Sequence, residues 1–153
     1  MTKKFNILHV DDSEKILSLL APMLLNVKNV GTINTATTLA MAKKIMCRQP
    51  ADVVILDVHL PDGISIDFLK WIKVVYSKTC VIMLSNHSDE FFRASVKKSG
   101  ADYFFDKSTE FEEVPKIISE INPLIIIKGK KRFQLRRKLF LKKISNIFLK
   151  KRK

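Results

Sequence analysis

Short runs of consecutive apolar residues alternate, over the first 127 residues, with longer stretches in which apolar residues recur every three or four positions. A short, continuously apolar run is typical of a strand buried on both faces of a sheet, and the longer spacing is typical of an amphipathic helix. We therefore predict five strands and five helices in alternation. The strands are expected at 5–10, 51–57, 80–84 and 101–105, with a weaker one at 30–34, and the first four helices near 16–24, 39–46, 66–75 and 88–98.

The alternation of strand and helix predicts βαβ units and a parallel sheet covered by helices on both faces. The expected fold class is α/β, as an open, doubly wound five-stranded domain. Pro22 lies inside the first helical pattern and should kink that helix or mark its weak point. Thr109 and Glu112 have the spacing of a capping box for the fifth helix, but Pro115 indicates that this helix begins a turn later.

Basic charge is concentrated at the C-terminal end of the chain. The whole chain has 28 Lys and Arg residues against 15 Asp and Glu residues, which gives a net charge of +13. Residues 128–153 hold 13 of these basic residues and no acidic residue, so that 1–127 is electrically balanced. We therefore divide the chain into a domain at 1–127 and a basic amphipathic tail at 128–153, which we expect to be helical or disordered.

The rest of the composition is that of an ordinary cytoplasmic domain. An apolar fraction of 46% suffices for a packed core. The apolar run 5–10 is too short for a signal peptide, and no run approaches the ~20 residues that span a bilayer. Cys47 and Cys80 lack the spacing of metal ligands, and each is expected to be a buried free thiol in a reducing compartment. We expect a soluble, cytoplasmic protein, with the inner membrane surface as a second location if the tail binds there.

Polar side chains follow four of the five predicted strands. In sheets of this kind ligands bind outside the carboxyl ends of the strands, so we expect these side chains to converge at one edge. A single Asp or Ser at such a position is ordinarily a helix cap, as Asp12 or Ser13 could be for the first helix. Several together indicate a site. The converging residues are Asp11, Asp12, Asp57, Ser85 and Lys107.

Three clustered carboxylates repel one another, so either their pKa values rise or a cation holds them. Oxygen ligands in small number favour Mg²⁺, which also binds phosphate oxygens. With Mg²⁺ and Lys107 to neutralise charge, Asp57 could attack a phosphoryl group in line while Ser85 supplies a hydroxyl. We therefore predict Mg²⁺ as the cofactor of a phosphoryl-accepting site.

The segments HVDDS, VVILDVHLPDG, VIMLS and GADYFFDK resemble, in order and spacing, the receiver domain of the two-component response regulator family. The resemblance covers residues 1–127 and implies a sheet of flavodoxin-like order 2-1-3-4-5. It implies a domain that takes a phosphoryl group from a sensor histidine kinase or phosphotransfer protein and then changes conformation. No catalysis beyond phosphotransfer and autodephosphorylation is implied, and a homodimer could form through the fourth helix, fifth strand and fifth helix.

The resemblance also implies roles for individual residues, in catalysis, metal binding and switching. Asp57 would be the phosphoacceptor, assisted by Lys107 and Ser85; Asp11, Asp12, Asp57 and the backbone carbonyl of His59 would hold Mg²⁺; Ser85 and the inward-turning Phe104 would form the switch.

Several residues depart from the family's pattern. Asn86 stands where a small residue is usual, which would narrow access to the site. His59 and His87 flank the phosphorylation site, either as exposed loop residues or as tuners of phosphoryl lifetime. Ser108 replaces the usual proline, and a cis peptide bond costs about 2.5–4 kcal/mol without proline, so the geometry of this loop stays open. Phe104 lacks the phenolic hydroxyl of a tyrosine switch.

Other classes of protein fit the sequence less well. A haloacid-dehalogenase-like hydrolase would need a second Asp two residues after Asp57, where His59 stands. A nucleotide-binding Rossmann or P-loop domain would need a glycine-rich turn after the first strand, and Gly31 is isolated. A phosphorylation-independent receiver that acts as an adaptor stays an alternative, although its usual sign, loss of the acidic pair or of the lysine, is absent.

The tail has three open interpretations. A basic segment with Phe, Leu and Ile anchors could lie on an anionic membrane surface, bind nucleic acid without sequence selectivity, or be a solvated extension without a specific function. On a helical wheel its apolar residues share one imperfect face. The basic residues proposed for binding are Lys130, Lys131, Arg132, Arg136, Arg137, Lys142 and Lys143.

Overall fold

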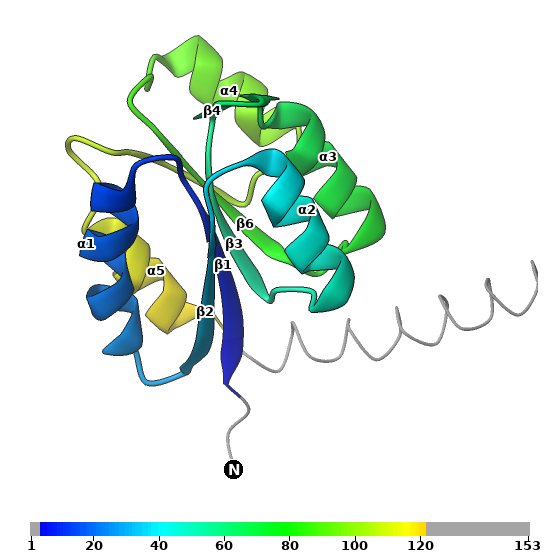
Figure 1. The fold of residues 1–153 in the computed structure, drawn as a ribbon. Helices are drawn as coiled ribbons and strands as arrows, with labels where there is room; N and C mark the ends of the chain where they lie inside the picture. The colour runs from blue at the N-terminus through cyan, green and yellow to red at the C-terminus, as the bar shows by residue number, and fades with distance from the viewer. Residues whose placement is uncertain (1–3, 122–153) are drawn as a thin grey trace, which may run out of the picture.

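Five parallel strands form the central sheet of the computed structural model, which describes residues 4–121. The spatial order is β2-β1-β3-β6-β7, which confirms the predicted order 2-1-3-4-5 because β6 and β7 are the fourth and fifth strands of this sheet along the chain. Figure 1 shows the sheet between two layers of helices. The strands are β1 (Phe5–Val10), β2 (Val30–Ala36), β3 (Val53–Asp57), β6 (Cys80–Ser85) and β7 (Tyr103–Asp106).

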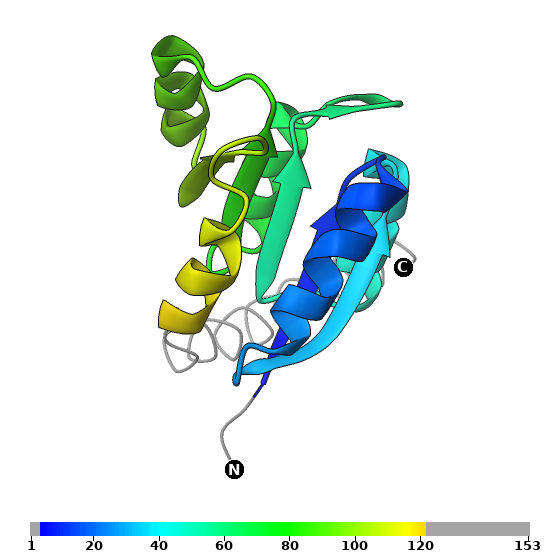
Figure 2. The ribbon, with the colours of Figure 1, turned by 90° about the vertical axis from the view of Figure 1, so that its left-hand side faces the viewer.

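Five helices cover the two faces of the sheet within the described range. Helices α1 and α5 pack on one face and α2, α3 and α4 on the other (Figures 1 and 2). This confirms the doubly wound α/β architecture. The helices are α1 (Glu14–Leu25), α2 (Leu39–Arg48), α3 (Ile66–Val75), α4 (Glu90–Lys98) and α5 (Glu113–Glu120).

Strand alternation divides the core into two clusters. In β1, Phe5 and Ile7 point to the α1/α5 face, and Leu8 and Val10 point to the α2/α3/α4 face. All five residues of β3 are buried, as expected for a central strand covered on both faces. The continuous apolar runs of the sequence therefore reflect burial on both sides of the sheet.

Three helices begin at a side chain that accepts a backbone hydrogen bond. Ser13 accepts from the Ile16 amide at 3.4 Å, Thr38 from the Met41 amide at 3.2 Å, and Asp89 from the Phe92 amide at 2.9 Å. Each cap satisfies an amide that has no partner within its helix. The caps fix where each chain segment turns back from the carboxyl edge of the sheet, which is the edge that carries the polar cluster.

The segment after β3 is more ordered than predicted. Instead of a plain loop, it forms a two-stranded hairpin of β4 (His59–Leu60) and β5 (Gly63–Ile64). Gly63 takes a φ of 138°, a conformation that favours glycine. The Asp62 carboxylate accepts the amides of Leu39 and Ala40, at 2.9 Å each, which ties the hairpin to the start of α2 and lowers the pKa of Asp62.

Three local predictions can be compared with the structure. Helix α1 continues through Pro22 to Leu25, although the proline cannot donate to the preceding turn. Helix α5 begins at Glu113, so the later start indicated by Pro115 is confirmed and the capping box at Thr109 is wrong. Pro115 falls in the first turn of α5, where the missing N–H costs no helical hydrogen bond.

The prediction that both thiols are buried is wrong for Cys47, which is exposed on α2, while Cys80 is partly buried. Successive residues of a helix point in directions about 100° apart, so that one can be buried and the next exposed. In α2, Met46 points into the core and the next residue, Cys47, points to solvent. No helix within residues 4–121 is long and apolar enough to cross a membrane. The tail at 128–153 and its predicted binding residues lie outside the described residues.

Candidate functional site

Three carboxylates meet at the carboxyl edge of the sheet. Strands β1 and β3 are neighbours, with Val10 opposite Leu56, so the residues that end or follow them are brought side by side. One carboxylate oxygen from each of Asp11, Asp12 and Asp57 lies within 4.8 Å of the others. Asp11 and Asp57 are buried and Asp12 is exposed, so that the cluster opens to solvent on one side.

Lys107 reaches this cluster from the end of β7, the strand at the edge of the sheet. Its Nζ lies 2.7 Å from Asp11 Oδ2 and 2.8 Å from Asp57 Oδ2, and its side chain is 8% exposed. The Lys107 amide donates to the Ser85 carbonyl at 3.0 Å, which anchors the start of the β7–α5 loop beside β6. One ammonium group therefore bridges two carboxylates that follow different strands.

Burial and the hydrogen bonds of Lys107 have opposing effects on the pKa values of the cluster. Burial raises the pKa of Asp57, and the hydrogen bond from Lys107 offsets this only in part. For Lys107, burial opposes the charged form, but the hydrogen bonds to Asp11 and Asp57 outweigh it and raise its pKa. A carboxylate whose pKa is raised is a better nucleophile once ionised, and an ammonium whose pKa is raised keeps its charge beside it.

The donor set of the cluster fits a divalent cation with oxygen ligands. Asp11, Asp12 and Asp57 carry three negative charges, and Lys107 balances only one of them, so one divalent ion would complete the balance. Few protein oxygens and one exposed carboxylate suit Mg²⁺, which keeps several waters. The predicted use of the His59 carbonyl as a further ligand stays a prediction, since no contact of that carbonyl tests it.

Ser85 and Phe104 lie on the two strands next to the cluster. Ser85 ends β6, is buried, and its Oγ accepts the His87 amide at 3.0 Å. Phe104 is 5% exposed and packs edge-on against Phe92 of α4, with ring centroids 6.0 Å apart. The Phe104 ring is therefore turned into the core under α4.

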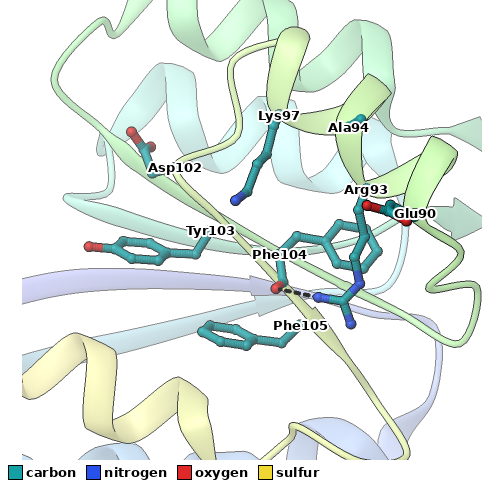
Figure 3. Close-up of a pocket in the computed structure, with 8 residues that line it drawn as sticks. All are labelled: Glu90, Arg93, Ala94, Lys97, Asp102, Tyr103, Phe104 and Phe105. Carbon is teal, nitrogen blue, oxygen red and sulfur yellow. Dashed lines mark hydrogen bonds between the residues drawn. The ribbon is translucent and has the colours of Figure 1, made fainter.

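Arg93 of α4 holds the surroundings of Phe104 together, and the sequence analysis did not identify it. Its guanidinium lies over the Phe104 ring at 4.9 Å, and its Nη1 donates to the Phe104 carbonyl at 3.4 Å, the dashed line in Figure 3. Nε donates to the Ser88 carbonyl at 3.1 Å, and Nη2 pairs with Glu110 at 2.5 Å. Three separate segments thus meet at one side chain.

A pocket of about 440 Å³ lies between α4 and β7 beside this network. Figure 3 shows Lys97 and Arg93 pointing from α4 toward the aromatic side chains of β7. Tyr103 and Phe105 also line this pocket, but their rings, with centroids 6.3 Å apart, pack on the opposite face of β7, against the core cluster of α1 and α5. This pocket is part of the face formed by the fourth helix and fifth sheet strand, which the family resemblance implies as a possible homodimer contact.

The loop after Lys107 is ordered without the usual proline. Asp106 Oδ1 accepts the Ser108 amide at 2.7 Å and the Thr109 amide at 3.1 Å. A hydrogen bond with the Ser88 side chain, followed by these amides, lowers the pKa of Asp106. No cis peptide bond occurs in residues 4–121. The Asp106 carboxylate therefore stabilises this turn by hydrogen bonds to its backbone amides.

Three histidines lie near the site, two of them exposed and one buried. The exposed His59 and His87 rings meet edge to face, with centroids 5.6 Å apart, and link the β4–β5 hairpin to the β6–α4 loop. His9, which the sequence analysis missed, is 1% exposed, and neither ring nitrogen has a partner among the described residues. Burial, with a smaller contribution from Lys107, lowers the pKa of His9 to about 3, so it is neutral. His9 follows Phe5 and Ile7 at every second position of β1, so it points to the same buried face as they do, and this spacing could have predicted its burial.

A parallel α/β sheet with clustered acids and a lysine at its carboxyl edge defines a class of phosphoryl-binding signalling domain. The model of the response regulator receiver domain family matches residues 7–119. The chain belongs to this family, as its sequence motifs implied.

Individual relatives and solved structures agree. The chain is 32% identical over 105 residues to the transcriptional regulatory protein GltR of Pseudomonas aeruginosa, covering 67% of this chain and 42% of GltR. It is 33% identical over 101 residues to protein-glutamate methylesterase/protein-glutamine glutaminase 2 of Hahella chejuensis, covering 66% of this chain and 27% of that protein. The receiver domain of a putative Luxo repressor protein from Vibrio parahaemolyticus superposes with a TM-score of 0.70 at 22% identity, over 86% of this chain and 97% of that one.

The response regulator DrrB of Thermotoga maritima shares 27% identity with a TM-score of 0.65, over 74% of this chain and 50% of DrrB. This chain thus spans less than half the length of the curated relatives named above. The shared part is the receiver domain, which in these proteins accompanies further sequence. The homology makes this chain a receiver domain of the two-component type, related to phosphoacceptor domains.

Proposed function

We propose that Asp57 accepts a phosphoryl group from a sensor histidine kinase or phosphotransfer protein in the cytoplasm, and that this shifts the conformation of the α4–β7 region. The observation that carries the proposal is the ammonium of Lys107, which lies within 2.8 Å of Asp57 and 2.7 Å of Asp11 at a three-carboxylate cluster. A buried nucleophile next to a fixed cation is suited to accept a group that carries negative charge.

In the proposed reaction an Oδ of Asp57 forms a bond to phosphorus while the bond from phosphorus to the donor nitrogen or oxygen breaks. Lys107 would neutralise charge on the phosphoryl oxygens, and the Ser85 hydroxyl would hydrogen-bond to one of them. Asp11, Asp12 and Asp57 would hold Mg²⁺, which supplies further positive charge to the phosphoryl oxygens. The donor leaves with the electron pair of the broken bond, and the aspartyl phosphate stays on the protein.

The proposed switch follows from the contacts of Ser85. If its Oγ turns to the phosphoryl group, it leaves the His87 amide that it now accepts at 3.0 Å. The β6–α4 loop would then move, and Arg93 would carry the movement to Phe104 through its contacts with Ser88 and the Phe104 carbonyl. Phe104 thus acts in the switch together with Arg93.

We further propose that this domain signals by contact and does not turn over a substrate. The methylesterase named above combines a receiver with its own activity, but the matched part covers 27% of that protein. The α4–β7–α5 face, with its pocket of about 440 Å³, is the proposed contact for a second copy or a downstream partner. The adaptor alternative has no specific observation in its favour, since the acidic residues and Lys107 are both present.

The test is incubation of the full chain with acetyl phosphate and Mg²⁺, followed by measurement of acid-labile phosphate. We expect one phosphoryl group per chain in the wild type and none in Asp57→Asn. Asp67→Asn, which removes an exposed carboxylate outside the cluster, is the matched control and should label like the wild type. Equal labelling of the wild type and Asp57→Asn would contradict the assignment.

A further inference from the structure

Acidic residues are concentrated at one edge of the electrically balanced domain. Twelve of the 15 acidic residues lie after the carboxyl ends of the sheet strands or in the first turns of the following helices. They therefore gather at the edge of the sheet that carries Asp57. These residues are Asp11, Asp12, Glu14, Asp57, Asp62, Asp67, Asp89, Glu90, Asp106, Glu110, Glu112 and Glu113.

The opposite edge, where the parallel strands begin, is basic. Lys4, Lys28 and Lys78 lie just before β1, β2 and β6, and Arg48 ends the helix that leads to β3. All four are exposed, and none takes part in a salt bridge found within residues 4–121. We call these four residues the amino-edge patch.

Backbone hydrogen bonds show that the segments carrying the patch are adjacent. The Phe5 amide donates to the Asn29 carbonyl at 2.7 Å, and the Asp52 amide donates to the Asn6 carbonyl at 2.7 Å. The Cys80 amide in turn donates to the Asp52 carbonyl at 2.9 Å. The starts of β1, β2, β3 and β6 are thereby tied into one surface.

Acidic residues at this edge do little to neutralise the patch. Asp52 is buried and accepts the Asn6 amide at 2.8 Å, and Asp102 pairs with Lys73. Glu120 at the end of α5 is the remaining acidic residue on this side. The four cations of the patch therefore face solvent with little local compensation, and their fields add over the edge.

The chain passes from the domain to the basic tail at this same edge. Helix α5 ends at Glu120, and Ile121 packs against the core cluster that contains Phe5 and Val30, at the starts of β1 and β2. Figures 1 and 2 show the foot of α5 near the first residues of these strands. The described part of the chain thus ends at the edge that carries the patch, and in the sequence the segment with 13 basic residues begins seven positions after Ile121.

Apolar residues accompany the basic ones on this side. Leu25 ends α1 and is 61% exposed, and Val74 in the last turn of α3 is 83% exposed. The tail also contains nine Phe, Leu and Ile residues among its 26 positions. A lipid interface uses apolar anchors beside cations, whereas binding to nucleic acid phosphates needs the cations alone. The combination favours an anionic lipid surface.

We propose that the amino-edge patch binds an anionic phospholipid membrane, and that the basic residues which follow in the sequence at 128–153 add to this attraction. Since the acidic edge lies at the other end of the strands, binding orients the Asp57 site away from the negatively charged bilayer. The site then faces the aqueous phase, where a phosphoryl donor can reach it. This inference concerns a surface remote from Asp57 and does not depend on its phosphorylation.

The test measures co-sedimentation of the unphosphorylated full chain with vesicles of phosphatidylcholine containing phosphatidylglycerol. Lys28→Glu with Lys78→Glu reverses two charges of the patch, and Lys15→Glu with Lys70→Glu makes the same change of net charge outside the patch. We expect the patch variant to lose about tenfold or more in vesicle affinity and the control variant to lose much less. Circular dichroism of each variant controls for folding.

Three outcomes would overturn the proposal. Equal vesicle affinity of the patch and control variants would mean that the tail acts without the domain. Failure of the wild type to bind phosphatidylglycerol vesicles would remove the membrane as the partner, and tight binding to duplex DNA with no vesicle binding would assign the surface to nucleic acid. A negative result for Asp57 labelling would leave this measurement unaffected, so that the two proposals fail separately.

Discussion

Lys107 Nζ lies 2.8 Å from Asp57 Oδ2, although the two residues are 50 positions apart in the chain. The ammonium and the carboxylate meet because β3 and β7 both end at the same edge of the sheet. Lys107 also contacts Asp11, so that one cation fixes the position of the proposed nucleophile relative to a proposed metal ligand.

His9 should make folding stability depend on pH. Burial lowers the pKa of His9 from 6.5 to about 3, so below pH 6.5 the unfolded chain binds a proton that the folded chain does not. This contribution is complete above pH 6.5 and is lost toward pH 3, with a slope of up to about 1.4 kcal/mol per pH unit. Urea unfolding between about pH 8 and about pH 5 should show a shallower loss in His9→Val than in the wild type. Parallel curves would contradict the assignment.

Asp12 should contribute to cation binding more than to folding. Its carboxylate belongs to the cluster but is exposed, so Asp12→Asn removes one ligand charge without opening a cavity. Calorimetric titration with Mg²⁺ should show a dissociation constant raised by about tenfold or more. Asp67→Asn, which removes an exposed charge outside the cluster, is the comparison. If both variants bind Mg²⁺ equally well, the cluster is not the metal site.

Arg93→Ala should destabilise the domain by roughly 1–2 kcal/mol, because it removes a partly buried ion pair and a cation–π contact together. Lys116→Ala removes the more exposed pair with Glu113 and should destabilise the domain much less. Urea denaturation of the two variants makes the comparison. Equal losses of stability would show that Arg93 does not hold α4, β7 and the following loop together.

The two thiols should differ in reactivity. Cys47 is exposed, whereas burial, with a smaller contribution from Asp102, raises the pKa of the Cys80 thiol to about 12. An aromatic disulfide reagent, whose released thiolate absorbs light, should react rapidly with one thiol in the folded protein and with two thiols in denaturant. Cys47→Ser should remove the fast phase. Two fast thiols in the folded wild type would contradict the burial of the Cys80 thiol that the structure shows.

The fold was predictable because its signals are local or periodic. Continuous apolar runs marked the central strands β3 and β6, the strand at β2 gave a weaker signal, and the rule that ligands gather at strand carboxyl ends predicted that Asp11, Asp12, Asp57 and Lys107 converge. The structure places all four carboxylate and ammonium groups in one cluster. The family match at residues 7–119 confirms the receiver resemblance.

The features that escaped prediction depend on how elements meet. The pairing of Arg93 with Glu110 requires the position of α4 against the loop before α5, which no sequence period reports. Met46 is buried and Cys47 is exposed because of the orientation in which the ten-residue helix α2 packs on the sheet. The hairpin after β3 is held in place by hydrogen bonds from the first amides of α2 to the Asp62 carboxylate. These contacts join residues more than 20 positions apart in the chain.

The most direct test of the central claim locates the phosphoryl group. After treatment with acetyl phosphate and Mg²⁺, borohydride reduces an aspartyl phosphate to homoserine, which peptide mass spectrometry assigns to a position. We expect homoserine at residue 57 alone, with Mg²⁺ required for its formation. Homoserine at Asp11, Asp12 or Asp62 in place of Asp57, or at no position in a chain shown to be folded, would contradict the proposal that this domain signals through Asp57.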